Sequence, residues 1–259
     1  LGEPALYDVC ATLSYRGEVV DERRFAFGVR TVRLVRTDTT DAQGSGEFCF
    51  FVNGEKTYIR GTNWVPLDTF HSRDAERLDK ALALLWESNC NMVRCWGGGV
   101  YEDHAFFDFC DRHGILVWQD FAMGCATYPQ NEEFQRKIAH EVETIVKKLR
   151  RHPSIALWAG DNECDVAAAY WEIVSGDPNE NRITRVTIPE VLRRVDPWRD
   201  FLPSSPYVSR AVYASGDPNR MPEDHLWGPR GYYKGKYYVN SNAHYVSEMG
   251  AFGCPSVES

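Results

Sequence analysis

The stretch that decides the fold is residues 152–163, which read His-Pro-Ser-Ile-Ala-Leu-Trp-Ala-Gly-Asp-Asn-Glu. Its centre, residues 155–160, is a short apolar run of the kind that forms a buried strand. Apolar residues at three- and four-residue spacings precede it and predict an amphipathic helix: Phe134, Ile138, Val142, Ile145 and Leu149. Pro153 ends that helix. A helix that leads into a buried strand is one unit of a parallel β/α fold.

The same unit repeats from about residue 58 onward. Short apolar runs predict seven strands, at residues 58–62, 92–96, 115–121, 155–160, 201–205, 225–227 and 244–248. Seven strands separated by helices fit an α/β fold of the (β/α)8 TIM-barrel type that lacks its last β/α unit. The alternative is a flavodoxin-like open sheet, because the two folds share local sequence patterns.

Two more helices are expected between the first three strands. Ser72 can cap a helix that carries four apolar residues on one face: Leu78, Leu82, Leu85 and Trp86. A second helix is marked by Phe106, Phe107 and Cys110 and is closed by Gly114. Both helices fall where β/α units require a crossover connection.

Residues 5–57 follow a different pattern, in which polar and apolar positions alternate in short bursts. This pattern predicts antiparallel strands, and Asn53-Gly54 is a strong two-residue hairpin signal. Three to five strands are too few to close a sandwich. We therefore expect residues 1–57 to be part of an immunoglobulin-like β-sandwich domain, followed by a TIM-barrel catalytic domain at 58–259.

Two glutamates stand at the ends of predicted strands, Glu163 after the fourth and Glu248 at the end of the seventh. The carboxyl ends of barrel strands form one face, so a barrel could bring these residues together across 85 residues of chain. Paired carboxylates of this kind suggest glycoside hydrolysis, in which one protonates the leaving oxygen and the other attacks the sugar carbon.

Tryptophans also gather near the strand ends. Trp96 stands beside three glycines that cannot build a core, which favours a platform for stacking on a sugar. We expect Trp64, at the end of the first strand, to contact substrate as well. For Trp118 and Trp158, filling of the barrel interior and contact with a sugar both stay open.

Several motifs together resemble glycoside hydrolase family 2, and within it the β-mannosidases. They are Gly-Thr-Asn-Trp-Val-Pro at 61–66, Arg-Cys-Trp-Gly-Gly-Gly-Val-Tyr-Glu at 94–102, Gly-Ile-Leu-Val-Trp-Gln-Asp-Phe at 114–121, residues 152–163 quoted above, and Ser-Glu-Met-Gly at 247–250. The resemblance covers residues from about 24 to 256. It implies a retaining mechanism with Glu163 as general acid/base and Glu248 as nucleophile, and it implies that Asn162 bonds the sugar 2-hydroxyl.

The resemblance implies further roles around these glutamates. Trp96 and Trp171 are similar to tryptophans that line the sugar subsite in the family. Arg94 would lie beneath the nucleophile and keep it charged, or else form a structural ion pair within the barrel.

The loop before the last strand resembles the Asp-x-His-x-Trp loop of β-mannosidases. His225 and Trp227 align with that pattern and are expected at the site, whereas Glu223 stands where aspartate is usual.

Composition excludes several classes of protein. The chain has 259 residues, 43% of them hydrophobic, and a net charge of −8, which argues against a nucleic-acid partner. Its one basic cluster, residues 147–151, ends a predicted helix, where cations are favoured. No apolar run reaches the roughly 20 residues needed to cross a bilayer, so we expect no membrane partner.

The eight cysteines show neither CxxC pairs nor metal-ligand spacing. We therefore expect reduced thiols and a reducing, cytoplasmic compartment. The mechanism requires no metal and no cofactor. The chain begins with Leu1, and it ends at Ser259, 11 residues after Glu248, which leaves no room for an eighth strand and leads us to expect a barrel incomplete at its C-terminus.

The sequence thus predicts a retaining exo-β-glycosidase that acts on terminal β-D-mannosyl residues of a carbohydrate substrate. Two alternatives stay open. The first is another family 2 activity, namely β-galactosidase, β-glucuronidase or exo-β-glucosaminidase. The second is a non-catalytic carbohydrate-binding module. The sequence does not determine the oligomeric state.

Overall fold

The computed structural model describes residues 3–171, 176–228, 232 and 234–250. Its centre is a parallel sheet of five strands in the order β10-β9-β8-β7-β6. These strands are β6 (Gly61–Trp64), β7 (Met92–Cys95), β8 (Leu116–Asp120), β9 (Ile155–Ala159) and β10 (Asp200–Leu202). Each strand pairs with its neighbour in the sequence, whereas a flavodoxin-like sheet would reverse its order next to the first strand. The open-sheet alternative is therefore wrong.

Two more parallel strands bring the sheet back toward its start. They are β11 (Glu223–Trp227) and β12 (Tyr245–Gly250), which pair with each other. The side-chain amide of Asn63 on β6 donates to the carbonyl of Ser247 on β12 at 3.0 Å. The seven strands thus curve round until the last lies beside the first, as strands do in a barrel.

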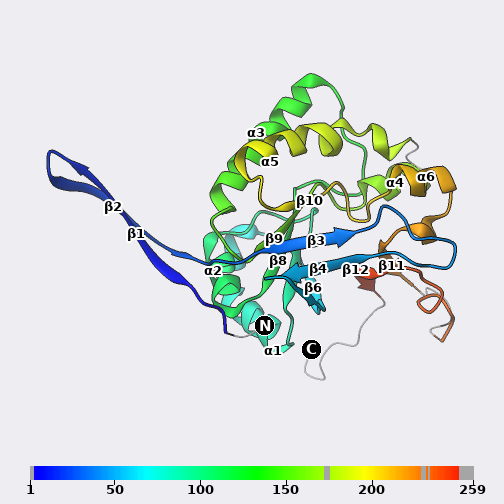
Figure 1. The fold of residues 1–259 in the computed structure, drawn as a ribbon, viewed down its shortest axis with the longest axis horizontal. Coiled ribbons are helices and arrows are strands. Elements are labelled where there is room, and N and C mark those ends of the chain that lie inside the picture. Colours follow the sequence, from blue (N-terminus) through cyan, green and yellow to red (C-terminus); the bar gives the residue numbers. More distant parts are fainter. Residues whose placement is uncertain (1–2, 172–175, 229–231, 233, 251–259) are drawn as a thin grey trace.

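Helices cover the outer side of the sheet (Figure 1). They are α1 (Leu78–Glu87), α2 (His104–His113), α3 (Glu132–Leu149), α4 (Cys164–Tyr170), α5 (Ile188–Val195) and α6 (Arg210–Ser215), with short helical turns η1 (His71–Glu76), η2 (Pro178–Glu180), η3 (Ile183–Thr187) and η4 (Pro218–Arg220). Gly114 ends α2 in the left-handed conformation at φ 64°, as the sequence predicts. Asn131 caps α3 by accepting a hydrogen bond from the amide of Phe134.

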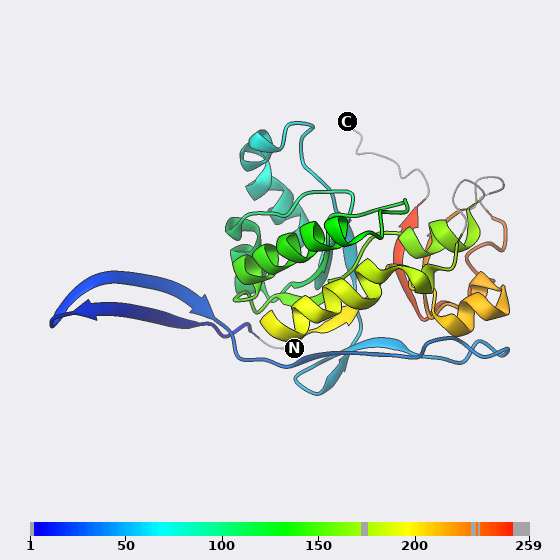
Figure 2. The same cartoon turned by 90° about the horizontal axis from the view of Figure 1, so that it is seen from above.

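The first 57 residues form two separate antiparallel units. The hairpin of β1 (Tyr7–Tyr15) and β2 (Glu18–Phe27) projects away from the body, as Figures 1 and 2 show. The second unit consists of β3 (Val32–Arg36), β4 (Phe48–Val52) and β5 (Glu55–Thr57). Asn53 and Gly54 both have positive φ, so the predicted hairpin turn is confirmed.

Strand β4 closes one end of the parallel sheet. Its Phe48 and Phe50 pack on Trp118 of β8, together with Leu157 and Leu202. The unit β3–β5 thus shares a hydrophobic core with the barrel strands, while the hairpin β1–β2 is mostly exposed. Trp118 serves as core filling, with a side chain only 1% exposed. The domain boundary after residue 57 stays a prediction.

Two local predictions are wrong. The first barrel strand is Gly61–Trp64 rather than 58–62, because the side chain of Asn91 bonds the carbonyl of Tyr58 and the amide of Arg60 just before the strand. Ser72 does not cap a helix but lies inside η1, and α1 begins only at Leu78. Trp86 is half exposed and packs edge-on against His113 instead of joining the core.

The described cysteines are free thiols, in agreement with the prediction, while Cys254 lies outside the described residues. Within the part of the chain that the structure describes, no helix combines the length and apolar character that crossing a membrane requires.

Gly160 gives a test of the packing where β9 ends. A Cβ atom at this position would lie 2.1 Å from the carbonyl oxygen of Pro203 and 2.8 Å from Thr184, so Gly160→Ala forces the backbone apart. We expect it to lower the free energy of unfolding by about 1–3 kcal/mol in a denaturant titration. At Gly176 no described atom lies within 4 Å of the added Cβ, so Gly176→Ala should change stability by no more than about 0.5 kcal/mol. Equal effects of the two variants would contradict this account.

Candidate active site

Glu163 and Glu248 meet at the carboxyl ends of the strands. One carboxylate oxygen of each lies, together with a ring nitrogen of His225, in a group whose members are all within 4.8 Å of one another. His225 Nδ1 is 2.8 Å from Glu163 Oε1 and 3.5 Å from Glu248 Oε2. The fold therefore brings the two glutamates together across the 85 residues that separate them.

Glu163 reaches this position through an unusual backbone conformation. Its φ is +61°, in the left-handed region that a residue with a side chain rarely adopts. The amide of Glu163 donates to the carbonyl of Ser205 at 2.8 Å, and Asn162 forms parallel bridges to Gly124 and Ser205. Because these bonds fix the backbone on both sides, they hold the turn that points Glu163 into the site.

Arg94 is the charged centre of the site, and its side chain is only 4% exposed. Nη1 donates to Glu248 Oε1 at 2.6 Å, and Nη2 donates to Asp120 Oδ2 at 2.7 Å and to Asn162 Oδ1 at 2.8 Å. Burial alone would lower the pKa of Arg94, but the carboxylates of Asp120 and Glu248 outweigh it and raise that pKa. Arg94 therefore stays charged.

The two glutamates have different surroundings. Glu248 accepts hydrogen bonds from Arg94 and from Trp227 Nε1, the latter at 2.9 Å, and such donors favour a charged carboxylate. At Glu163, burial raises the pKa, but the hydrogen bond and charge of His225 act against it, and the pKa is lowered overall. The Cys125 thiol is a second partner of Glu163, with Sγ 3.3 Å from Oε2. Burial raises the pKa of Cys125 to about 11, so it remains a thiol that can donate.

A pocket of about 590 Å³ opens beside Glu163. Its walls include Trp171, Asp224, His225 and Trp227. A larger cavity of about 980 Å³ lies between the edges of β6 and β12 and the strands β4 and β5. Neither glutamate lines that larger cavity, so the smaller pocket is the better candidate for substrate.

Most of the site residues that the sequence predicts do come together. The structure gathers six of them around Arg94 and the pocket: Glu163, Glu248, Asn162, Arg94, His225 and Trp227. Trp171 lies at the pocket wall. Trp96 is half-buried with its ring against Gly98, and the next residue, Gly97, approaches the backbone of Asn162.

Trp64 is a correction. It lies in the hydrophobic core against Phe106, and its Nε1 donates to Glu102 at 2.9 Å. Successive side chains of a strand point to opposite faces. Since Asn63 faces Arg94, Trp64 must face the helices.

Four residues of the site were missed by sequence reasoning. Asp120 ends β8 and accepts from both Arg94 and the amide of Gly97, so the strand-end signal used for Glu163 could have found it. Glu223 is buried at 2% exposure, although the sequence marks it only as a departure from a family pattern. Cys125 and Ser205 lie in loops without periodicity, and no sequence signal indicates them.

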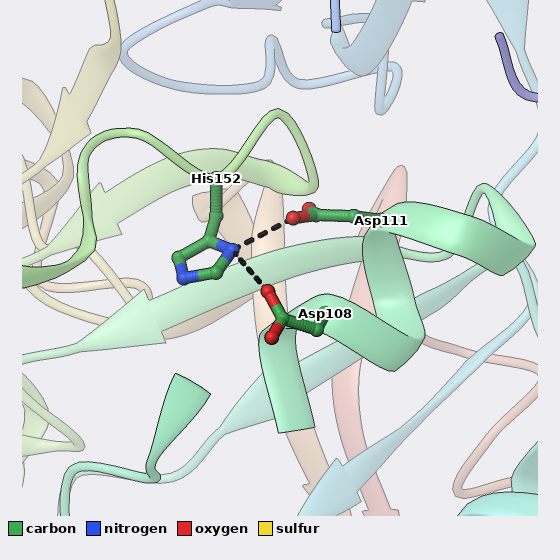
Figure 3. A group of neighbouring side chains, drawn as sticks. All are labelled: Asp108, Asp111 and His152. Carbon is green, nitrogen blue, oxygen red and sulfur yellow. Dashed lines mark hydrogen bonds and ion pairs between the residues drawn. The ribbon is translucent and has the colours of Figure 1, made fainter. Parts of the chain in front are cut away.

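Two groups of histidine and carboxylate side chains have a spacing that could hold a metal ion. In the first, His225 and Glu163 are in direct hydrogen-bond contact. The second, Asp108, Asp111 and His152, joins α2 to the segment before β9, as Figure 3 shows. We interpret both as hydrogen-bonded groups.

The second group is fully engaged by the protein itself. Asp111 accepts from His152 Nδ1 at 2.7 Å and from the amide of Ser154 at 2.9 Å, and His152 Nε2 lies 2.8 Å from His104 Nδ1. It lies at the amino ends of the strands, a location that in TIM barrels serves stability rather than catalysis.

The charge of Arg94 can be tested by substitution. Arg94→Met leaves the buried carboxylates of Asp120 and Glu248 without a cation, and we expect it to lower the free energy of unfolding by about 3–5 kcal/mol. The control is Arg33→Met, which removes an exposed ion pair with Asp200 and should cost no more than about 1 kcal/mol. A loss at Arg94 as small as that of the control, measured by denaturant unfolding, would show that the buried cation is dispensable.

Asp224 predicts a pH dependence of stability. Burial raises the pKa of this carboxyl to about 7 from an ordinary value of 3.8. Between these values the folded state holds one proton more than the unfolded state, so stability falls as pH rises through the window, by at most about 1.4 kcal/mol per pH unit. Asp224→Asn removes this titration and keeps the oxygen that accepts from the amide of His225. Unfolding free energies measured from pH 4 to 8 should converge toward the variant's favour as pH rises, and parallel curves would contradict the assignment.

Comparison with known proteins agrees with this geometry. The TIM barrel domain of the glycosyl hydrolases family 2 matches residues 46–185, more than half of the chain. The β-mannosidase of Capra hircus is 32% identical over 98% of this chain, and β-mannosidase B of Thermothelomyces thermophilus is 35% identical over 83%. The chain spans 30% and 26% of these two relatives, respectively.

Solved structures show the same relationship. The crystal structure of β-D-mannosidase from Dictyoglomus thermophilum superposes with a TM-score of 0.86 at 34% identity and covers 99% of this chain, which spans 31% of that protein. A Bacteroides uniformis β-glucuronidase shares the fold, with a TM-score of 0.69 at 20% identity over 96% of this chain and 30% of its own. From the match to the family's barrel domain, the chain belongs to glycosyl hydrolase family 2.

Proposed function

We propose that the protein containing this chain is a retaining exo-β-glycosidase that hydrolyses terminal, non-reducing β-D-mannosyl residues. The observation that carries this proposal is the approach of Glu163 and Glu248, which have carboxylate oxygens within 4.8 Å of each other. Retaining enzymes hold their two carboxyl groups about 5–5.5 Å apart, while inverting enzymes need roughly 6.5–9.5 Å to admit a water. The short separation supports double displacement.

The surroundings of the two glutamates support the division of roles. Glu248 receives hydrogen bonds from Arg94 and Trp227, so it is suited to remain ionised and attack the anomeric carbon. Glu163 lies at the pocket opening beside His225, so it is suited to give a proton to the leaving oxygen. In the second step Glu163 takes a proton from water, which then releases the sugar from Glu248.

The remaining polar and aromatic residues fit a sugar subsite. Asn162 is held by Arg94 beside both glutamates, where it could bond the 2-hydroxyl, a contact that strengthens toward the transition state. Trp171 and Trp227 offer apolar walls against which a pyranose ring can pack. Trp96 remains a candidate for a third wall. Relatives named as β-mannosidases at 32–35% identity favour a mannoside over the sugars of more distant relatives.

We also propose that an eighth β/α unit completes the barrel between β12 and β6. The cavity of about 980 Å³ lies along the edges of these two strands. Among the described residues, the side chain of Asn63 supplies the hydrogen bond that joins them. A strand placed there would pair with both edges, as closure of a barrel requires.

Substitution of the two glutamates in the full-length protein tests the roles. Glu248→Ala should abolish turnover of nitrophenyl β-mannoside, and azide should restore it with a product of inverted configuration. Glu163→Ala should lower turnover by about 10²–10⁴-fold for poor leaving groups, much less for dinitrophenyl mannoside, and azide should give a product of retained configuration.

Glu102→Gln provides the control, since Glu102 is a buried carboxyl that bonds Trp64 away from the site. It should keep most of the activity. An exchange of the two azide products would exchange the two roles. Faster turnover of another nitrophenyl β-glycoside would replace the mannoside assignment, and failure of a 2-deoxy-2-fluoro glycosyl fluoride to label Glu248 would exclude double displacement.

A further inference from the structure

Beneath Glu163 a chain of hydrogen bonds connects four side chains. Glu223 Oε1 accepts from Ser205 Oγ at 2.7 Å, Ser205 Oγ lies 3.1 Å from His225 Nε2, and His225 Nδ1 lies 2.8 Å from Glu163 Oε1. Glu223 and Ser205 are buried, at 2% and 0% exposure. They touch neither the pocket nor Glu248, and nothing in the two-glutamate mechanism by itself requires them.

The direction of these bonds is fixed by Glu223. Three donors converge on its carboxylate: the hydroxyls of Ser205 and Ser247 and the amide of Tyr207. A carboxylate in such surroundings is charged and can only accept. The single hydroxyl proton of Ser205 is therefore directed at Glu223, and Ser205 can offer only a lone pair to His225.

It follows that His225 carries a hydrogen on Nε2. Its other nitrogen, Nδ1, faces Glu163. If the ring is neutral, Nδ1 accepts a proton from the carboxylic acid of Glu163, and if the ring is charged, Nδ1 donates to the carboxylate. In either state a single proton lies between Glu163 Oε1 and His225 Nδ1.

We propose that Glu223 and Ser205 are positioning residues that hold His225 in this tautomer, so that Glu163 and His225 keep the catalytic proton as a shared pair. This inference rests on the proposed role of Glu163 as general acid/base. It explains how a carboxyl whose own pKa is lowered by His225 can still deliver a proton, because the pair titrates as a unit and the ring stores the proton.

The charges around His225 agree with this arrangement. From other elements it is faced by Glu163 and Glu248, and on its own strand by Glu223 and Asp224. Carboxylates on several sides favour a charged ring. The other groups that act on Glu163 are the buried cation Arg94 and the thiol of Cys125.

The first test needs no turnover. In the full-length protein with ¹⁵N-labelled histidine, NMR should show His225 protonated on Nε2 throughout the pH range, with Nδ1 titrating. His225→Asn identifies the signals. Ser205→Ala should remove the tautomer preference, and Glu163→Gln should displace the titration of Nδ1. A His225 with hydrogen on Nδ1 and a bare Nε2 would overturn the relay, whether or not the protein hydrolyses a mannoside.

The second test separates positioning from mere support of the fold. For an alkyl β-mannoside, whose leaving group needs protonation, Ser205→Ala should lower kcat/KM by about 10–100-fold. The basic limb of its pH profile should also move to lower pH by roughly half to one unit, because the charged ring loses its acceptor. For dinitrophenyl β-mannoside, which leaves unprotonated, kcat/KM should change little.

Three controls complete the design. Ser205→Thr keeps a hydroxyl and should restore both the rate and the pH profile. Ser154→Ala removes a buried hydroxyl that has no partner among the described residues, and it should act like the wild type on both substrates. In a Glu163→Ala background, Ser205→Ala should add no further loss on dinitrophenyl β-mannoside. Equal loss on both substrates with an unchanged pH profile would overturn the proposal, while absence of hydrolysis with the expected NMR tautomer would instead refute the proposed function.

Discussion

The buried guanidinium of Arg94 is the interaction on which the site depends. From β7 it reaches Asn63 on β6, Asp120 on β8, Asn162 after β9 and Glu248 on β12. A cation removed from water is stable only when its charge and its hydrogen-bond donors are matched. Because the matching partners stand at the ends of different strands, satisfying Arg94 fixes where those ends lie relative to one another.

A second buried group supports the loop that carries Glu163. Arg185 pairs with Asp165 at the start of α4, and Asp165 also accepts from the amide of Val208. Nearby, Asp161 accepts from the hydroxyl of Ser204 and from the amide of Cys164. Burial raises the pKa of both aspartates. These bonds hold the strained turn at Glu163 on its rear side, so the left-handed residue is constrained by several elements at once.

The site therefore has two layers with different work. The upper layer, around the pocket, is aromatic and partly open, as substrate entry requires. The lower layer is polar and buried, and almost every donor in it has an acceptor. Glu223 belongs to the lower layer. Its longer side chain, which stands where the family resemblance leads one to expect aspartate, reaches Ser205 and Ser247 at the same time.

The sequence by itself determined the elements and the two glutamates. Helical periodicity, Gly114 and Asn53-Gly54 specify local structure through the conformations that each residue allows, so the chain alone is enough to predict them. Strand-end acids likewise become neighbours in any barrel. Only the tertiary structure decided that Trp64 fills the core, since the assignment of its face depends on a one-residue register of β6. Only the fold could reveal Ser205 and Cys125, because their roles arise from hydrogen bonds to Glu223, His225 and Glu163 across long stretches of chain, and such pairings leave no periodic trace in the sequence.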